Sequence, residues 1–108
     1  MKLSQQKCVP CEGGVPPMDT ENVQKHLTEL NGWGVKENKI HRVFQFVDFG
    51  SAIKFVNATA EIAEREKHHP DIYIFSYNKV EITLWTHAIN GLSLNDFILA
   101  AQIDKIKK

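Results

Sequence analysis

The chain has no excess of charge of either sign. Its 108 residues hold 13 basic and 13 acidic side chains, so the formal net charge is zero. A nucleic-acid binder normally presents a cluster or stripe of Lys and Arg, and none stands out along this sequence. We therefore expect no nucleic-acid partner.

Long apolar runs are also missing. No segment approaches the roughly 20 apolar residues that a membrane-spanning helix needs. Residues 1–6 lack both the apolar core of a secretory signal and the Arg-rich pattern of a transit peptide. We expect no membrane partner and a cytoplasmic location, where the two cysteines, Cys8 and Cys11, would be reduced.

Little regular structure is expected in residues 1–18. This segment is rich in residues that interrupt helices and strands, namely Pro10, Gly13, Gly14, Pro16 and Pro17. We predict an extended or mobile N-terminal lead-in over residues 1–18 and a single domain over residues 19–108. A chain of this size buries roughly 60–68% of its unfolded surface, which is enough for one core.

The remaining residues alternate between helical and strand patterns. Apolar spacing and capping residues predict a helix from residue 19 or 20 to about Gly32, a helix over residues 48–67 and a last helix opening at residues 93–96. Period-2 alternation predicts strands over residues 33–36, 40–47, 72–75 and 79–87. The order α-β-β-α-β-β-α with two hairpins predicts an α+β fold of two layers, a four-stranded antiparallel sheet with helices on one face.

Three of these elements are expected to bury one face each. In the strand over residues 79–87, alternation places Val80, Ile82 and Leu84 on one face and Glu81, Thr83, Trp85 and His87 on the other. The buried stripe of the long helix is predicted to include Ile53, Val56, Ala60 and Ala63. The last helix is predicted to place Leu94, Phe97, Ile98, Ala101 and Lys105 on one side.

The chemically most informative feature is a group of three histidines. His68 and His69 are expected at the C-terminus of the second helix, where the partial negative charge of the helix end favours a protonated imidazole. Glu64 precedes His68 by one helical turn and would add to this effect. If the strand that carries His87 ends beside this helix terminus, all three histidines line one concave site. Such a site can supply general acid catalysis near neutral pH.

Two other interpretations of the histidines stay open at this level. A His pair before a proline and a His at a strand end are often ordinary surface or structural residues. Three His ligands with an open fourth position would make a catalytic zinc centre. However, the side chains of adjacent histidines such as His68 and His69 generally diverge, and the helical HExxH spacing is absent. We therefore expect no bound metal.

Several short motifs follow one another in a fixed order through most of residues 20–106. They are His68-His69-Pro70, Tyr77-Asn78 with the strand that follows it, Thr86-His87, and Gly91-Leu92-Ser93 with Asp96. Residues 30–33 and 42–46 extend the match. This order resembles the signature of the pterin-4a-carbinolamine dehydratases.

The resemblance implies an α+β fold, dimers or tetramers, and a reaction without metal or cofactor. That reaction is the dehydration of 4a-hydroxytetrahydrobiopterin to quinonoid dihydropterin, a step of tetrahydrobiopterin recycling that is coupled to an aromatic amino-acid hydroxylase. By position, the resemblance implies that His68, His69 and His87 are the active-site histidines and that Glu64 is a carboxylate beside them. It further implies substrate contacts by Lys67, His68, His69, Pro70, Trp85, Thr86, His87, Ala88 and Asp96.

Chemistry assigns provisional roles within this set. Loss of the 4a-hydroxyl needs a proton on the leaving oxygen and a base for the N5 proton. We expect His69 or His87 to act as the acid and His68 to contribute to binding or base chemistry. A flat pterin ring also needs an apolar contact, for which Trp85 and Tyr73 are candidates.

Two residues weaken parts of this comparison. Ile89 stands two residues after the third histidine, where family members often carry Cys, so no thiol role is expected there. Asp96 is fully explained as the N3 residue of a capping box opened by Ser93, with Asp in place of Glu.

The alternative function is a dimerisation or binding module that acts as a transcriptional cofactor. An exposed apolar face on the last helix would favour this alternative, whereas the neutral charge disfavours direct contact with DNA. Cys8 and Cys11 form a CxxC motif, but a thioredoxin-like motif needs a preceding strand and a following helix. We expect an adventitious or structural use of this pair.

Overall fold

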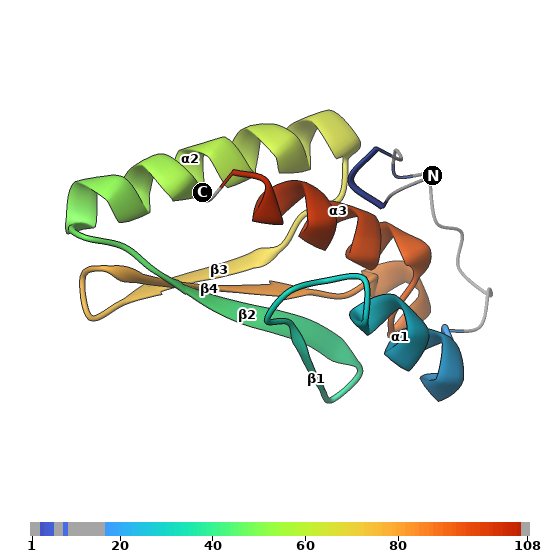
Figure 1. Cartoon of the computed structure of the whole chain (residues 1–108). Helices are drawn as coiled ribbons and strands as arrows, with labels where there is room; N and C mark the ends of the chain where they lie inside the picture. Colours follow the sequence, from blue (N-terminus) through green and yellow to red (C-terminus); the bar gives the residue numbers. More distant parts are fainter. Residues whose placement is uncertain (1–2, 6–7, 9–16, 107–108) are drawn as a thin grey trace.

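The fold combines one antiparallel sheet with a layer of helices. The computed structural model describes residues 3–5, 8 and 17–106, which form three α-helices and one four-stranded sheet. In chain order the elements are the 3-10 turn η1 (Leu3–Gln5), α1 (Thr20–Leu27), β1 (Gly34–Lys36), β2 (Lys39–Gln45), α2 (Phe49–Glu66), β3 (Asp71–Phe75), β4 (Lys79–Leu84), the 3-10 turn η2 (His87–Ile89) and α3 (Leu94–Asp104). Helices α2 and α3 lie over one face of the sheet (Figure 1). The predicted α+β class and element order are confirmed.

The sheet has the strand order β1-β2-β4-β3, and every neighbouring pair is antiparallel. β1 and β2 are joined by Glu37 and Asn38, whose φ angles of 54° and 62° are those of a two-residue hairpin turn. β2 pairs with β4 so that Ile40 lies opposite Leu84. This register places the apolar residues of both strands on the face that the helices cover.

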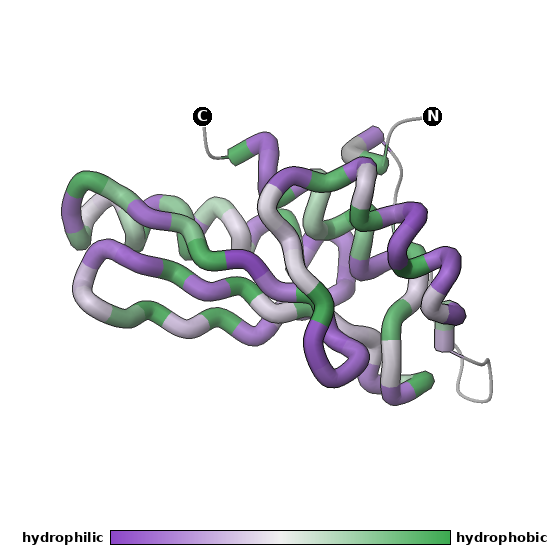
Figure 2. The backbone as a smooth tube through the Cα atoms, turned by 60° about the horizontal axis from the view of Figure 1, so that its bottom comes forward, coloured by the Kyte–Doolittle hydropathy of each residue, from purple (hydrophilic) through white to green (hydrophobic). Residues whose placement is uncertain are grey.

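The inner face of the sheet forms the floor of the core. Its central side chains are at most 1% exposed and comprise Ile40, Phe44, Val80, Ile82 and Leu84. Figure 2 shows the underlying alternation as green and purple bands along the strands. The predicted inward face of β4 is therefore confirmed.

Helix α2 begins as predicted, but a different stripe is buried. Its N-cap Asp48 accepts a hydrogen bond from the Ser51 N–H at 2.8 Å, and this bond lowers the pKa of the Asp48 carboxyl. The buried positions are Ala52, Phe55, Thr59 and Ala63. The predicted stripe holds at Ala63, which is buried, and at Val56, which is partly buried against the core, but it was wrong at the exposed Ala60, and Ile53 only flanks the buried stripe.

Aromatic packing explains this rotation of α2. The Phe55 ring lies 4.6 Å from that of Phe44 and 5.1 Å from that of Phe46, between centroids. Burial of one such side chain contributes roughly 1.5–3 kcal/mol, so the helix turns to place Phe55 on the sheet. The small side chains of Ala52 and Ala63 then allow the helix to lie close to it.

Helix α3 is buried on nearly all sides, not on one side as predicted. It packs against α2, η1 and the core of the sheet. Two members of the predicted face, Leu94 and Lys105, are exposed. The buried set includes polar residues, and its members are Asn95, Asp96, Phe97, Ile98, Leu99, Ala100, Gln102 and Ile103.

A partly buried ion pair lies at the edge of the core beside α3. Arg42 places its guanidinium 4.4 Å from the Phe44 ring and donates from Nη1 to Asp104 at 2.8 Å. Trp33, 8% exposed, donates from Nε1 to the same carboxylate at 2.9 Å. Burial raises the pKa of Asp104, and the bonds from Trp33 and Arg42 only partly offset this.

The described part of the N-terminal segment contacts the domain. Leu3 of η1 is 6% exposed and belongs to the core, and Cys8 packs against the same cluster, so these parts of residues 1–18 contact the domain. Within the described residues, no helix is both long enough and apolar enough to cross a membrane.

Candidate functional site

A cavity of about 670 Å³ lies where the end of α2, the segment after β4 and the start of α3 meet. Its lining comprises Cys8, residues 65–71, residues 85–88 and Asn95. The two histidine segments that the sequence marks, residues 68–69 and His87, therefore share one cavity. The cavity is lined by the predicted Lys67, Pro70, Trp85, Thr86 and Ala88 as well.

The end of α2 directs the two adjacent histidines apart. The helix ends at Glu66, and Lys67 follows in the left-handed conformation with a φ of 55°. The N–H groups of Lys67 and His68 both donate to the carbonyl of Ala63. His68 is therefore outside the helix, so the prediction that Glu64 lies one helical turn before His68 and acts on it was wrong, and the carboxylate lies beside His69 instead.

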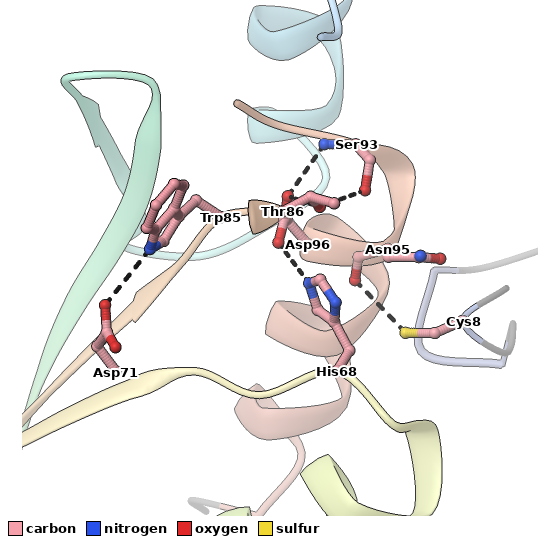
Figure 3. Close-up of polar contacts among 8 residues, drawn as sticks. All are labelled: Cys8, His68, Asp71, Trp85, Thr86, Ser93, Asn95 and Asp96. Carbon is pink, nitrogen blue, oxygen red and sulfur yellow. Dashed lines mark hydrogen bonds and ion pairs between the residues drawn. The ribbon is translucent and has the colours of Figure 1, made fainter. Parts of the chain in front are cut away.

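His68 points inward and contacts a buried carboxylate. Its Nε2 lies 2.6 Å from Oδ1 of Asp96, and the two side chains are 13% and 0% exposed (Figure 3). A carboxylate group only accepts hydrogen bonds, so we assign the proton in this contact to Nε2 of His68. The other ring nitrogen, Nδ1, is then the atom of His68 that can accept a proton.

Asp96 gathers three donors around one carboxylate. Besides His68, it accepts from the Thr86 hydroxyl at 2.8 Å and from the Ser93 N–H at 3.0 Å. The capping box with Ser93 is present as predicted, and it places Asp96 in the first turn of α3, where the helix dipole stabilises negative charge. A carboxylate buried in this way is fully partnered and fixes the His68 ring.

His69 lines the cavity, but most of its side chain is exposed to solvent. Its Nε2 lies 3.4 Å from Oε1 of Glu64, and these side chains are 62% and 78% exposed. Exposed pairs of this kind contribute little to stability. Glu64 therefore stands beside His69, although it does not line the cavity.

His87 does not lie on a strand, so its predicted position on the outer strand face was wrong. β4 ends at Leu84, and His87 begins the 3-10 turn η2. The cause is a tight loop: the Thr86 N–H donates to the Gly91 carbonyl at 2.8 Å, and Asn90 adopts a φ of 51° to close it. The exposed His87 ring stacks on Trp85, with centroids 4.0 Å apart and an interplanar angle of 23°.

Of the two aromatic residues predicted as candidates for contact with a flat ring, one lines the cavity and the other lies outside it. Trp85 lines the cavity, whereas Tyr73 is 61% exposed, stacks on Phe75 and lies outside the lining. Asp96 lies behind the cavity wall and reaches the site through His68 and Thr86.

Five lining residues were not predicted from the sequence: Cys8, Arg65, Glu66, Asp71 and Asn95. Glu66 and Asp71 directly flank predicted residues, which was the available signal. Nothing in the sequence links Cys8 to the cavity, because it lies 58 residues before Glu66, whose Oε1 accepts its backbone N–H at 2.8 Å. The second cysteine of the CxxC motif, Cys11, lies outside the described residues.

Glu66 is a buried carboxylate in the cavity wall. Its side chain is 5% exposed. Burial alone would raise its pKa, but hydrogen bonds from the Cys8 N–H, Arg65 and Gln102 outweigh this, and the pKa is lowered. Glu66 is therefore a stably ionised wall residue.

The described residues contain no group of three His, Cys, Asp or Glu side chains arranged to hold a metal ion. The three histidines instead have separate partners: Asp96 for His68, Glu64 for His69 and Trp85 for His87.

Comparison with known proteins points to one family. A family model described as pterin 4 alpha carbinolamine dehydratase matches residues 16–106. A protein of Rubrobacter xylanophilus, provisionally named pterin-4-alpha-carbinolamine dehydratase, is 43% identical over 97% of this chain and 98% of its own. A protein of Nitrosomonas europaea with the same provisional name is 47% identical over 98% of this chain and 94% of its own.

Solved structures show the same fold. The crystal structure of a transcriptional coactivator/pterin dehydratase from Brucella melitensis superimposes with a TM-score of 0.81 at 32% identity, over 85% of this chain and 99% of that one. A pterin dehydratase-like protein identified as a RuBisCO assembly factor in the alpha-carboxysome gives a TM-score of 0.57 at 24% identity, over 68% of this chain and 84% of that one. The latter likeness concerns the fold alone.

Proposed function

The chain belongs to the pterin-4-alpha-carbinolamine dehydratase family, and we propose that it dehydrates 4a-hydroxytetrahydrobiopterin to quinonoid dihydropterin. The observation that carries the proposal is the shared cavity of His68, His69 and His87, with a buried carboxylate fixing His68. Family membership supplies the substrate class, and the cavity supplies groups suited to the chemistry.

The reaction is a loss of water across the C4a–N5 bond. The C4a–O bond breaks as a proton is delivered to the leaving hydroxyl, the N5 proton is removed, and a C4a=N5 double bond forms. We assign the acid to His69 or His87, because both are exposed imidazoles at the cavity. We assign base or binding chemistry to His68. Its Nδ1 can accept a proton while its Nε2–H donates a hydrogen bond to Asp96.

The other predicted residues are assigned to binding and orientation. Lys67, Pro70, Trp85, Thr86 and Ala88 line the cavity and form its walls around the substrate. Asp96 orients His68 and Thr86 from behind the wall, and Glu64 orients His69. The proposal extends to assembly into a dimer or tetramer and to supply of the substrate by an aromatic amino-acid hydroxylase.

The test is a coupled assay. A hydroxylase generates the 4a-hydroxypterin, and quinonoid dihydropterin is followed with and without the protein in the presence of EDTA. We expect acceleration over the spontaneous rate that is insensitive to the chelator. Separate His69→Ala and His87→Ala variants should identify the acid, since loss of proton transfer lowers the rate at least about tenfold.

Two outcomes would contradict this mechanism. No acceleration over the spontaneous rate by the folded wild-type protein would contradict the dehydratase proposal. Loss of activity with EDTA would replace the histidine mechanism with a metal-dependent one. An unchanged rate in one of the two variants would remove that histidine from the role of acid.

The alternative of a transcriptional cofactor has one supporting observation. The Brucella melitensis protein, at 32% identity, is described as a transcriptional coactivator as well as a pterin dehydratase. An exposed apolar face on the last helix would have favoured this alternative, but α3 is buried on nearly all sides. Whichever of the His69→Ala and His87→Ala variants loses dehydration separates the two functions, because that variant should keep any partner binding.

A further inference from the structure

We propose that Trp85 is a positioning residue, whose indole face holds the imidazole of His87 at the cavity instead of receiving the substrate ring. The inference deepens the proposed function, on which it rests for the role of His87. It concerns an indole that motifs alone would assign to stacking on the pterin.

The contact between the two rings is the first observation. The centroids of Trp85 and His87 are 4.0 Å apart, and the ring planes differ by 23°, so the imidazole covers one face of the indole. His87 is exposed, and its side chain has no hydrogen-bond or ion-pair partner among the residues that the structure describes. The indole is therefore the surface that defines the orientation of this imidazole.

The indole is itself held from two neighbouring strands. Lys39 of β2 lies directly across the sheet, one step beyond the Ile40–Leu84 pair, and its Nζ is 4.6 Å from the ring centroid of Trp85. From the other side, Asp71 of β3 accepts the Nε1–H of Trp85 at 3.4 Å (Figure 3). These contacts fix the plane of Trp85 independently of its contact with His87.

The occupied faces argue against stacking of substrate on Trp85. The imidazole of His87, at 4.0 Å between centroids, covers one face of the indole, and the Lys39 ammonium also lies over the ring, 4.6 Å from its centroid. A flat ligand would have to displace one of them. Trp85 lines the cavity, and we infer that its influence on the reaction runs through His87.

Orientation of an exposed imidazole has a large effect on proton transfer. An unsupported His87 would sample several rotamers, and displacement of a reacting group by about 1 Å can lower a rate by about 100-fold. A rigid aromatic surface restricts those rotamers without a hydrogen bond to either ring nitrogen. Both nitrogens then remain available for proton transfer.

The experiment compares Trp85→Leu with Trp85→Phe in the full chain. Leucine fills volume without a stacking face, whereas phenylalanine keeps a face and loses only the Nε1–H. We expect Trp85→Leu to lower kcat at least about tenfold with less than about a twofold change in KM, and Trp85→Phe to keep most of kcat. A rise in KM with unchanged kcat in Trp85→Leu would show that Trp85 contacts the substrate and would overturn the proposal.

Proton NMR of the His87 ring provides a readout that does not need activity. Ring current from a stacked indole shifts the His87 Hε1 and Hδ2 signals upfield, and His87→Ala assigns them. We expect this shift to be lost in Trp85→Leu and largely kept in Trp85→Phe. Signals that do not move in Trp85→Leu would overturn the inference. An inactive wild-type protein would overturn the proposed function, and the NMR result would still decide the role of Trp85.

The matched control is Tyr73→Leu. Tyr73 is an exposed aromatic residue on the outer face of the neighbouring strand and lies outside the cavity lining. Its loss should leave both the His87 signals and kcat unchanged. A change as large as that of Trp85→Leu would mean that any aromatic loss on this face disturbs the site, which would overturn the specific assignment.

Discussion

Asp96 lies fully buried in the first turn of α3, where its two carboxylate oxygens face different partners. Oδ2 accepts from the Ser93 N–H and the Thr86 hydroxyl, and Oδ1 faces His68 Nε2 at 2.6 Å. The Ser93 donor is a backbone group that cannot reverse its role. The Oδ2 position therefore requires a hydrogen-bond acceptor, and this requirement decides which group can face His68 from the Oδ1 position.

Asp96→Asn is expected to reverse the tautomer of His68. The amide oxygen will take the Oδ2 position, where two donors meet, so the amide NH₂ will face Nε2 of His68 and require it to accept. The proton then moves to Nδ1, the atom proposed to act in the cavity. We expect kcat to fall at least about tenfold, and ¹⁵N NMR of the imidazole to show Nδ1 protonated.

The same substitution at an unrelated helix start provides the control for Asp96→Asn. Asp19 caps α1 by accepting from the Asn22 N–H at 2.8 Å and has no histidine partner among the described residues. Asp19→Asn should leave the His68 spectrum and kcat unchanged. An unaltered His68 tautomer in a folded Asp96→Asn protein would contradict the proposed orientation of His68.

At the scale of elements, local signals were sufficient where the cause was local. Asp48 marks the start of α2, and Pro70 excludes helical geometry at His69, so the limits of this helix were predictable. The end of β4 was not, because apolar alternation continues toward His87 while the pairing of Thr86 with Gly91 pulls the chain into a loop. The burial of α3 depends on η1 and α2, which are distant in sequence.

The same distinction applies to the candidate site. Motif order predicted eight residues that line the cavity, since they fall in a recognisable family pattern, but it also included Glu64 and Asp96, which lie outside the lining. It did not predict their partners: Glu64 lies beside His69 because Lys67 breaks the helix before His68. Partner choice is decided by side-chain direction in three dimensions, which spacing alone does not encode.

Gly91→Ala is expected to destabilise the loop that carries η2. A Cβ at Gly91 would lie 2.6 Å from Cβ of Pro17, next to the hydrogen bond from the Met18 N–H to the Leu92 carbonyl. Relief of this overlap must separate the two segments, at a cost of about 1–3 kcal/mol in the free energy of unfolding. Urea unfolding of both proteins measures the difference.

Gly50→Ala is the counterpart in an open position. A Cβ at Gly50 meets nothing closer than Asp48 Oδ1 at 3.7 Å, and Gly50 lies within α2. Alanine at this helical position should be neutral or stabilise by up to about 1 kcal/mol. Equal destabilisation by both substitutions would show that the Pro17 contact is not the cause.

At the scale of the whole molecule, Glu66 joins three separate parts of the chain. Oε1 accepts from the Cys8 N–H at 2.8 Å, and Oε2 accepts from Gln102 at 3.4 Å and from Arg65 at 3.2 Å. The N-terminal segment, α2 and α3 thus meet at one carboxylate in the cavity wall. Figure 1 shows these three parts of the backbone side by side. The integrity of the cavity and the global stability are therefore coupled through the charge of Glu66.

This coupling predicts a specific pH dependence of stability. Because the pKa of Glu66 is lowered below its ordinary value of 4.5, the unfolded state binds more protons than the folded state in the window below 4.5. The stabilisation is thus fully present above that value and is lost as pH falls through the lowered pKa. Glu66→Gln, which cannot ionise, should be less stable than wild type by about 1–3 kcal/mol at pH 7, and the difference should shrink on acidification. Urea unfolding of both proteins from pH 7 to about pH 3 tests this; a gap that stays constant over this range would show that hydrogen-bond geometry, and not the charge of Glu66, holds the three segments together.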